Sequence, residues 1–369
     1  MMYILALESS CDETAVAIIR GCSDTHGVEN VEVLANCVAS QIDIHKVYGG
    51  VVPELASREH TKQLKPLLEM ALEQAGVTLQ DIDVFAGTAG PGLSSSLLIG
   101  HSAAKMLAVA SGKTYYAMNH MEGHLLSPFL GKSQSVAVGQ AMGLVVSGGH
   151  TMLVDIARVG QYHILGQTVD DAAGEAFDKG ARMLKLAYPG GPEIEKLAKL
   201  GNPQAYDFPR SMLHEKEEGK QHSFSFSGLK TSLYYTLQKE EQKHQREQKA
   251  KHQAGESEQE FQLAPAVLND ICASFQQAII DVLVEKTLAA AVKHKRSVVA
   301  ISGGVACNKT LITQLQSRLN KRGIELLTAD NALNTDNALM IAYAAWQRHQ
   351  AGQVSDSLEA GIYPRFSGF

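Results

Sequence analysis

Short apolar runs recur along the chain and are separated by longer segments with helical periodicity. Residues 3–7, 83–88 and 297–301 are apolar runs of the length that is typical of buried strands. The segment 268–283 instead has large apolar residues three or four positions apart, which predicts one long amphipathic helix. Strands that alternate with helices predict a mixed or parallel sheet with helices packed on it.

Helix boundaries are marked by proline and glycine. Pro53 stands at the first-turn position of a helix over residues 54–74, and Gly76 ends it. A second helix, rich in small residues, is expected over 93–110. Its serines, glycine and alanines permit close helix approach, so this helix either docks a partner or packs inside its own lobe.

Two segments share one strand–turn–strand design. Residues 3–19 and 142–156 both run from an apolar strand through a polar turn into a second apolar strand. Because they are far apart in the chain, they predict a duplicated α/β half-domain. The length of 369 residues fits two domains.

Composition and charge narrow the functional classes. The chain is 45% hydrophobic and 20% charged, as in soluble globular proteins, and no signal peptide or spanning helix of about 20 apolar residues is evident. Five cysteines without a C-x-x-C pair favour a reducing cytoplasm over a disulfide framework. A net charge of -6 predicts that any nucleic acid would meet a local basic patch or a partner's surface.

Three glycine-pair turns point to a nucleotide site. They lie in residues 142–151, 188–192 and 300–308, and two of them follow an apolar strand. Glycines let a backbone approach a phosphate closely, with free N–H groups facing the anion. We expect a Cβ at Gly149 or Gly304 to push the backbone off the ligand or to demand a forbidden φ.

A histidine pair stands beside these turns. His120 and His124 are four residues apart, so on a helix they share one face and can hold a metal ion. Met121 occupies the place where the zinc-protease motif H-E-x-x-H needs glutamate, which argues against that class. Asp336 is the best candidate for a third, oxygen ligand; the alternative is a plain helix N-cap.

Other acidic residues have two interpretations each. Asp12 and Glu13 lie in the first hairpin turn, where they serve turn chemistry or act as a general base or phosphate-facing group. Asp178 is too deep in its helix to serve the helix dipole, so it is a candidate for a ribose hydrogen bond. The hydrophilic segment 238–260 predicts a solvated loop or a frayed helix.

Motifs along nearly the whole chain together resemble the TsaD family of tRNA N6-adenosine threonylcarbamoyltransferases, which were formerly described as O-sialoglycoprotein endopeptidases. The matching segments are LESSCDET at 7–14, GVVPELASREH at 50–60, NHMEGH at 119–124, VSGGHT at 146–151, DDAAGEAFDK at 170–179, YPGGP at 188–192, SFSGLK at 225–230 and SGGVACN at 302–308.

The resemblance implies an α/β fold of the actin, sugar-kinase and Hsp70 (ASKHA) type, with two duplicated lobes and a nucleotide cleft between them. We expect one lobe to comprise residues 1–127 and 342–369, and the other residues 128–341. It also implies transfer of a threonylcarbamoyl group from threonylcarbamoyl-AMP to N6 of the adenosine 3′-adjacent to the anticodon, in tRNAs that read codons beginning with A.

Site residues follow from the same resemblance. The implied metal ligands are His120, His124 and Asp336. The implied substrate-binding positions are Val145, Val146, Ser147, Gly148, Gly149, Asp178, Gly191 and Asn308. Glu195 is the nearest equivalent of an aspartate that family members often carry after the Gly-Gly-Pro turn.

The implied cofactor is one divalent metal ion. Two histidines and a carboxylate suit Fe(II) or Zn, whereas Mg prefers oxygen ligands. The implied partners are tRNA, an inactive paralogue of the same fold (TsaB-like) and a small P-loop ATPase (TsaE-like), with no membrane. Two alternatives remain at this point: a non-catalytic paralogue that acts as a scaffold and, more weakly, a metalloprotease.

Overall fold

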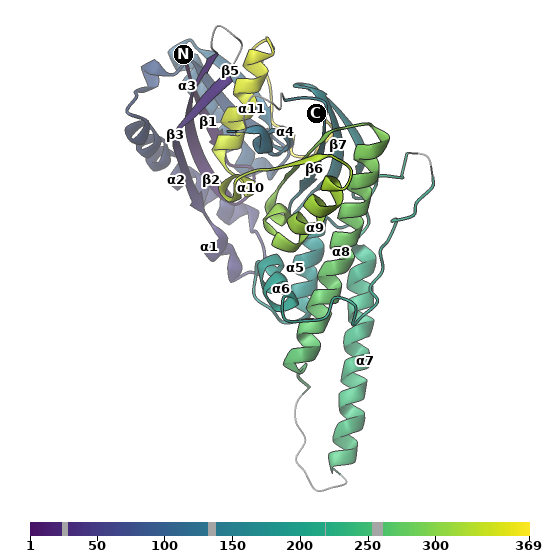
Figure 1. Cartoon of the computed structure of the whole chain (residues 1–369). Coiled ribbons are helices and arrows are strands. Elements are labelled where there is room, and N and C mark those ends of the chain that lie inside the picture. The colour runs from purple at the N-terminus through teal and green to yellow at the C-terminus, as the bar shows by residue number, and fades with distance from the viewer. Residues whose placement is uncertain (24–28, 132–137, 218, 253–260) are drawn as a thin grey trace.

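The computed structural model describes residues 1–23, 29–131, 138–217, 219–252 and 261–369 and contains two five-stranded sheets (Figure 1). The N-terminal sheet has the order β3-β2-β1-β4-β5, with β1 Met2–Glu8, β2 Glu13–Ser23, β3 Glu29–Ser40, β4 Val84–Gly90 and β5 Thr114–Asn119. The C-terminal sheet has the order β10-β9-β6-β7-β8, with β6 Ala141–Val146, β7 Thr151–Arg158, β8 Gln161–Gln167, β9 Val298–Ser302 and β10 Glu325–Thr328.

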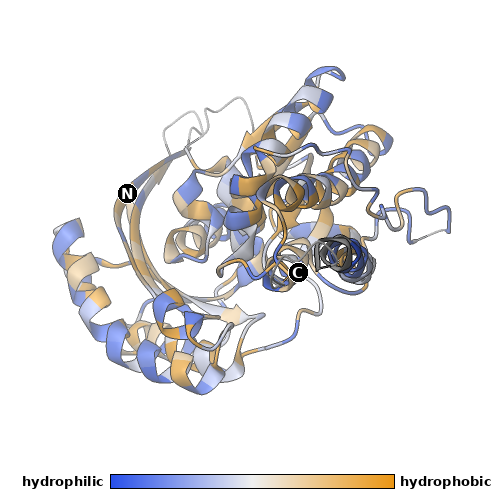
Figure 2. Cartoon of the chain, turned by 90° about the horizontal axis from the view of Figure 1, so that it is seen from below, coloured by the Kyte–Doolittle hydropathy of each residue, from blue (hydrophilic) through white to orange (hydrophobic). Residues whose placement is uncertain are grey.

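Helices cover these sheets and connect their strands. They are α1 Ile42–Lys46, α2 Pro53–Ala75, α3 Ser94–Ser111, α4 His120–Leu126, α5 Ala173–Met183, α6 Gly190–Ala198, α7 Ser227–His252, α8 Pro265–Lys293, α9 Lys309–Asn320, α10 Asn331–Asn334 and α11 Ala338–Gln350. Short 3-10 turns occur at η1 Leu79–Asp81, η2 Ser127–Phe129 and η3 Gly304–Cys307. Figure 2 shows hydrophilic residues on the outward surfaces of the peripheral helices.

The two sheets repeat one topology. In the first, central β1 pairs antiparallel with β2 and parallel with β4. In the second, central β6 pairs antiparallel with β7 and parallel with β9. Each sheet therefore contains one antiparallel hairpin with parallel crossover strands beside it. This shared topology confirms the predicted duplication of an α/β half-domain.

Local sequence signals account for the main helices of the first lobe. Pro53 is the first residue of α2, and Gly76 ends it in the left-handed conformation that glycine adopts without strain. Gly112 ends α3 in the same way. The predicted helices 54–74 and 93–110 are therefore confirmed to within a residue or two.

Helix α11 joins the two lobes at their centre (Figure 1). It contacts β1, β2 and α4. One buried apolar cluster contains Ile4 and Ala17 of the first sheet, Val145 and Ala300 of the second, and Ile341 of α11. The division of the lobes at residues 127 and 342 stays a prediction, because α11 begins at Ala338 and packs in this shared core.

Two long helices, α7 and α8, contain segments for which the sequence makes a prediction. Helix α8 is long and apolar enough to cross a membrane by length and composition, but 67% of its apolar window is buried inside the protein, as in the core helix of a globular fold. The hydrophilic stretch after residue 238 continues α7 as helix up to His252, and residues 253–260 lie outside the described part.

Gly21 tests the packing of α11 on the first sheet. A Cβ built there would meet the Trp346 ring at 2.3 Å, and Trp346 is fully buried. We expect Gly21→Ala to lower the free energy of unfolding by about 1–3 kcal/mol, as overpacking does. Gly361→Ala is the control, because nothing lies within 4 Å of its added Cβ. Denaturant unfolding of both variants checks this, and equal stability would contradict the packing described.

Candidate metal centre between the two lobes

Helix α4 presents both histidines to one place. Asn119, the last residue of β5, caps the helix by accepting hydrogen bonds from the N–H groups of Met121 at 2.9 Å and Glu122 at 3.4 Å. The helix therefore begins at His120, and His124 follows one turn later on the same face. Both side chains are buried, with ring centroids 4.8 Å apart. The predicted pairing of these residues on a helix is confirmed.

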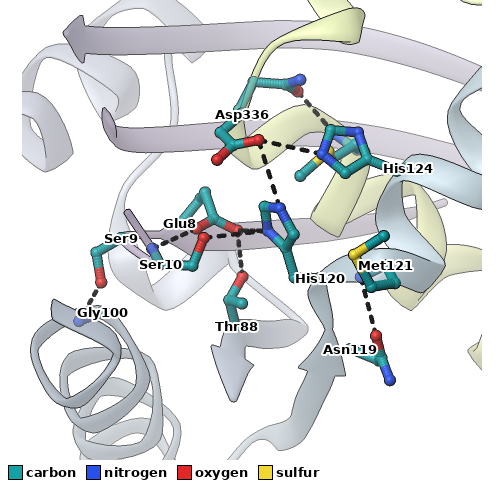
Figure 3. A network of polar contacts seen from close by, with 12 residues as sticks. Glu8, Ser9, Ser10, Thr88, Gly100, Asn119, His120, Met121, His124 and Asp336 are labelled. Atoms are coloured by element: carbon teal, nitrogen blue, oxygen red, sulfur yellow. Dashed lines mark hydrogen bonds and ion pairs between the residues drawn. The ribbon is translucent and has the colours of Figure 1, made fainter. Parts of the chain in front are cut away.

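Asp336 joins the histidine pair from the far end of the sequence (Figure 3). Its Oδ1 lies 3.1 Å from His124 Nε2 and 3.4 Å from His120 Nε2. Asp336 does not cap α11, because Asn337 does so by accepting the N–H of Met340 at 2.9 Å. The N-cap alternative is therefore wrong. One ligand atom from each of the three residues lies within 4.8 Å of the others, close enough to share one metal ion.

Glu8 completes the cluster and was missed by the sequence analysis. Its Oε2 lies 3.1 Å from His120 Nδ1 and accepts a 2.5 Å hydrogen bond from Thr88 Oγ1, while Oε1 accepts the N–H of Ser10 at 2.5 Å (Figure 3). Holding Nδ1 in this way orients the His120 ring and leaves Nε2 to face Asp336. The available signal was a carboxylate at the end of an otherwise apolar strand.

The charges in this cluster stabilise one another. Burial alone would raise the pKa of Glu8 and of Asp336, but the adjacent His120 lowers the pKa of both carboxyl groups. Burial likewise opposes protonation of His120, yet Asp336 and Glu8 hold the pKa of that imidazole well above its usual range. The cluster thus places the fully buried carboxylate of Glu8 and the partly exposed carboxylate of Asp336 around His120, where they favour a positive charge between them, which is the electrostatic setting of a cation site.

The first hairpin turn reaches the same region. Burial, Asp336 and Asp12 together raise the pKa of Glu13 to about 9, and Ser40 Oγ donates to Glu13 Oε1 at 3.2 Å. Across the lobes, burial raises the pKa of Tyr188 to about 12, helped by the charges of Asp178 and Asp12. The turn of the first lobe therefore lies within electrostatic range of the Tyr188 turn of the second.

His150 is a second residue that the sequence analysis missed. Burial, together with the nearby His120 and His124, lowers the pKa of its imidazole to about 4. Its ring packs edge-on against Phe366, with centroids 6.2 Å apart. A neutral imidazole therefore stands beside the cluster, at the end of the Ser147–Gly149 turn.

The glycine turns are open where a ligand was predicted. A Cβ on Gly148, Gly149 or Gly304 would meet nothing within 4 Å, and none of the three has a left-handed φ. The expectation of a forbidden φ at Gly149 and Gly304 is therefore wrong. That constraint belongs to Gly303, which has φ +95° and whose Cβ would lie 2.4 Å from the Val146 carbonyl oxygen.

Val145, Val146 and Ser147 lead into the first of these turns. Both valine side chains are fully buried in β6 and pack into the cores. They can therefore meet a ligand only through their backbone. Ser147 Oγ accepts the N–H of His150 at 3.1 Å, which closes the turn.

The second-lobe helices hold the other predicted binding residues. Asp178 of α5 accepts the N–H of Gly190 at 2.7 Å, and burial raises the pKa of its carboxyl group. Gly191 follows, where an added Cβ would come only within 4.0 Å of Phe177. Asp178 therefore fixes the start of α6 and places the nearly open Gly191 beside it.

Asn308 and Glu195 meet at the start of α9. Asn308 caps this helix by accepting the N–H of Leu311 at 3.0 Å, and its Nδ2 donates to Gln276 Oε1 at 2.7 Å. Glu195 accepts the N–H of Lys309 at 3.1 Å. Both side chains thus have structural partners that the sequence did not reveal, and their predicted contacts with a substrate stay predictions.

An ion pair with a fully buried carboxylate holds α4 against α11. Glu122 Oε2 lies 2.6 Å from Arg348 Nη2 of α11, and Tyr162 donates to Glu122 Oε1 at 2.8 Å. Gly123 lets the two helices approach closely, since a Cβ there would lie 2.9 Å from the side chain of Ile341. The Glu122–Arg348 pair and the contact at Gly123 together hold α4 against α11, the helix that begins just after Asp336.

The architecture defines a class of protein: two duplicated α/β lobes with a candidate metal centre between them. Full-length HypF, solved in a phosphate- and nucleotide-bound form, matches 96% of this chain and 47% of its own with a TM-score of 0.57 at 12% identity. HypF from T. kodakarensis matches 98% of this chain and 50% of its own, also with a TM-score of 0.57, at 13% identity. These likenesses support the fold alone, which is the predicted actin, sugar-kinase and Hsp70-like architecture.

Sequence comparison gives the family. The model of the TsaD family, "tRNA N6-adenosine threonylcarbamoyltransferase", matches residues 32–343. The protein of that name from Ralstonia pickettii (strain 12J) is 45% identical over 99% of this chain and 97% of its own length. The one from Magnetococcus marinus is 46% identical over 93% of this chain and 91% of its own. The chain belongs to the TsaD family, and neither the scaffold nor the protease alternative is favoured.

The Glu122–Arg348 pair can be tested by a double-mutant cycle. We expect Arg348→Met to lower the free energy of unfolding by about 3–5 kcal/mol, because it leaves a buried carboxylate without its cation. Adding Glu122→Gln should restore part of that loss, since the uncompensated charge is removed. Denaturant unfolding of both single variants and the double variant measures the coupling. Additive losses would show that the pair does not hold the two helices together.

Proposed function

We propose that this chain transfers the threonylcarbamoyl group of threonylcarbamoyl-AMP to N6 of the adenosine 3′-adjacent to the anticodon, in tRNAs that read codons beginning with A. The observation that carries the proposal is the cluster of two buried histidines, His120 and His124, with the partly exposed Asp336 between the lobes. Family membership supports the reaction class, since its relatives carry the name of that activity over nearly their whole length.

The three residues fit a resident divalent metal ion. His120 Nδ1 is engaged by Glu8, so Nε2 is the nitrogen left for a cation, and His124 Nε2 and Asp336 Oδ1 face the same point. Two imidazoles and one carboxylate suit Fe(II) or Zn better than Mg. When bound there, the metal would supply Lewis acidity toward the donor's carbonyl and phosphate oxygens.

The rest of the donor site is assigned to the chain's own groups. The donor is a mixed anhydride, whose leaving phosphate needs N–H donors, and the open turns at Gly148, Gly149 and Gly304 have room for it. Asp178 and Gly191 lie at the start of α6 and are assigned to the ribose side of the donor. Asn308 and Glu195, at the start of α9, are assigned to its adenosine side.

Proton transfer is assigned to the first hairpin turn. The attacking amine is a poor nucleophile, because its lone pair is delocalised into the purine, so a base must accept its proton. Glu13, with its pKa raised to about 9, holds a proton at neutral pH in the metal-free protein. Glu13 is therefore assigned to phosphate-facing hydrogen bonds, and the base role is assigned to Asp12, the other acidic residue of this turn.

The proposal includes partners and a cytoplasmic location. A TsaB-like paralogue is assigned to the outer face of α3, where Leu98, Met106 and Val109 are 51%, 70% and 56% exposed. Three of the small residues of α3 are not part of this surface. Ser96, Gly100 and Ala104 are buried, and Cβ atoms added at Gly100 and at the facing Gly87 would meet Ser9 and Ala104. The internal-packing alternative therefore holds for these three residues. A TsaE-like ATPase completes the proposed assembly.

Ligand replacement tests the metal assignment. His120→Ala or His124→Ala should abolish transfer while leaving the fold largely intact, because each removes a coordinating nitrogen. The loss should exceed the roughly 10- to 100-fold cost of an outer-sphere substitution. His163→Ala, at an exposed position of β8, is the matched control. The measurements are metal content and modified-nucleoside formation from donor and tRNA. A double histidine variant that keeps wild-type activity without bound metal would refute the assignment.

Charge predicts how tRNA is engaged. With a net charge of -6, the isolated chain should bind tRNA weakly at physiological salt, and productive transfer should require the partner proteins. Two measurements check this: tRNA affinity of the chain alone as a function of salt, and transfer with and without the partners. Tight binding and many turnovers by the lone chain would contradict it.

A further inference from the structure

The short helix α1 and the turn that follows it present a group of exposed apolar side chains near the site. Ile44, Val47 and Tyr48 are 39%, 84% and 65% exposed, all within five residues. We call these three residues the α1 tip. In Figure 1, α1 extends below the first sheet, on the side where α6 of the other lobe lies. Grouped exposure of large apolar side chains is typical of a binding surface.

A buried polar network supports the α1 tip from behind. Gln41, His45 and His60 are almost fully buried. His45 Nε2 lies 3.1 Å from Gln41 Oε1, its Nδ1 accepts the N–H of Val52 at 3.2 Å, and Gln41 Nε2 lies 3.3 Å from His60 Nδ1. Satisfied polar networks of this kind fix a single arrangement. The tip is therefore held in place with its apolar side chains outward.

The same network ties the tip to the proposed catalytic turn. The N–H of Gln41 donates to the Asp12 carbonyl at 3.0 Å, and His60 Nε2 lies 3.0 Å from the Cys11 carbonyl. At helical rise, the seven residues from Gln41 to Tyr48, which lies in the turn after α1, span about 10 Å. That separation is comparable to one or two nucleotides of a single strand.

We propose that the α1 tip is a stacking platform for an unpaired nucleobase beside the acceptor adenosine, with Tyr48 as the stacking ring. This inference rests on the proposed function. An adenosine whose N6 is to react must leave its stack to enter the cleft, and its neighbour then loses a stacking partner. Proteins provide aromatic rings for such splayed bases. Val47 and Ile44 would exclude water from the stacked pair, and the exposed Lys46 can meet the adjacent phosphate.

The size of the tip favours a base over a protein partner. Stable protein interfaces bury about 800 Å² on each side and involve about 20 or more residues. Three side chains at the end of α1 and in the turn after it fall far short of that, whereas a single ring suffices for one base. The platform is also connected through Gln41 to the turn that holds Asp12, where the acceptor must arrive.

The test compares Tyr48→Ala with Tyr48→Phe and with Tyr235→Ala, an exposed tyrosine of α7 that is 56% exposed. The substrates are an anticodon stem-loop and two versions of it with an abasic residue on either side of the acceptor adenosine. Transfer is measured with donor and the required partner proteins, and donor affinity and metal content are measured separately.

We expect Tyr48→Ala to lower kcat/KM for the intact stem-loop by roughly 5- to 150-fold, the range for one lost stack. Tyr48→Phe and Tyr235→Ala should retain activity, and donor affinity and metal content should not change. For one of the two abasic stem-loops, wild type should have a kcat/KM as low as that of Tyr48→Ala on the intact stem-loop. On that same substrate Tyr48→Ala should lower kcat/KM no further, because the base with which the ring would stack is already missing.

Other results would overturn the inference. One is an unchanged kcat/KM in Tyr48→Ala, and another is a loss of kcat/KM that persists in full on both abasic stem-loops. A loss of donor affinity, or weakened association with the partner proteins, would also overturn it. Failure of the wild-type assembly to modify any stem-loop or full tRNA would refute the proposed function itself, which separates the two outcomes.

Discussion

The contact between α4 and α11 is the constraint on which the candidate site depends. It brings His124 and Asp336, 212 residues apart in sequence, to within 3.1 Å. A glycine between the two histidines permits the close approach, and the buried Glu122–Arg348 pair fixes it. Because α11 also packs on β1 and β2, the position of the metal ligands is tied to the cores of both lobes. Once the lobes have docked, the ligand geometry follows.

Electrostatics then determines what this position can hold. Two carboxylates, the fully buried Glu8 and the partly exposed Asp336, lie on either side of His120, and holding them there without a cation would be costly. In the metal-free protein a protonated His120 supplies the balancing charge, and a divalent ion would replace that proton. The surrounding openings at Gly148, Gly149 and Gly304 leave room for an anionic ligand next to the cation.

Features of local origin could be predicted from the sequence, and features of tertiary origin could not. The helix starting at Pro53, the duplicated hairpins and the spacing of His120 and His124 depend on neighbours in the chain, so pattern alone predicts them. Glu8, His150 and the Glu122–Arg348 pair acquire their roles only when distant elements meet. Gly303, rather than Gly304, carries the left-handed backbone because of where β9 meets the Val146 carbonyl, which no local pattern reveals. The family motifs identified three candidate metal ligands from the sequence. The hydrogen bonds that orient those ligands could be seen only in the structure.

The most direct test of this account is X-ray absorption at the edge of the metal bound to the purified chain, with and without a non-hydrolysable donor analogue. The account predicts two imidazole nitrogens and a carboxylate oxygen around one metal ion, with the analogue's oxygens entering the coordination shell when it binds. His120→Ala and His124→Ala should each remove one imidazole from the spectrum. A shell without histidine, a shell that includes thiolate sulfur, or one that ignores the analogue would contradict the central claim that these residues hold a metal ion to act on the donor.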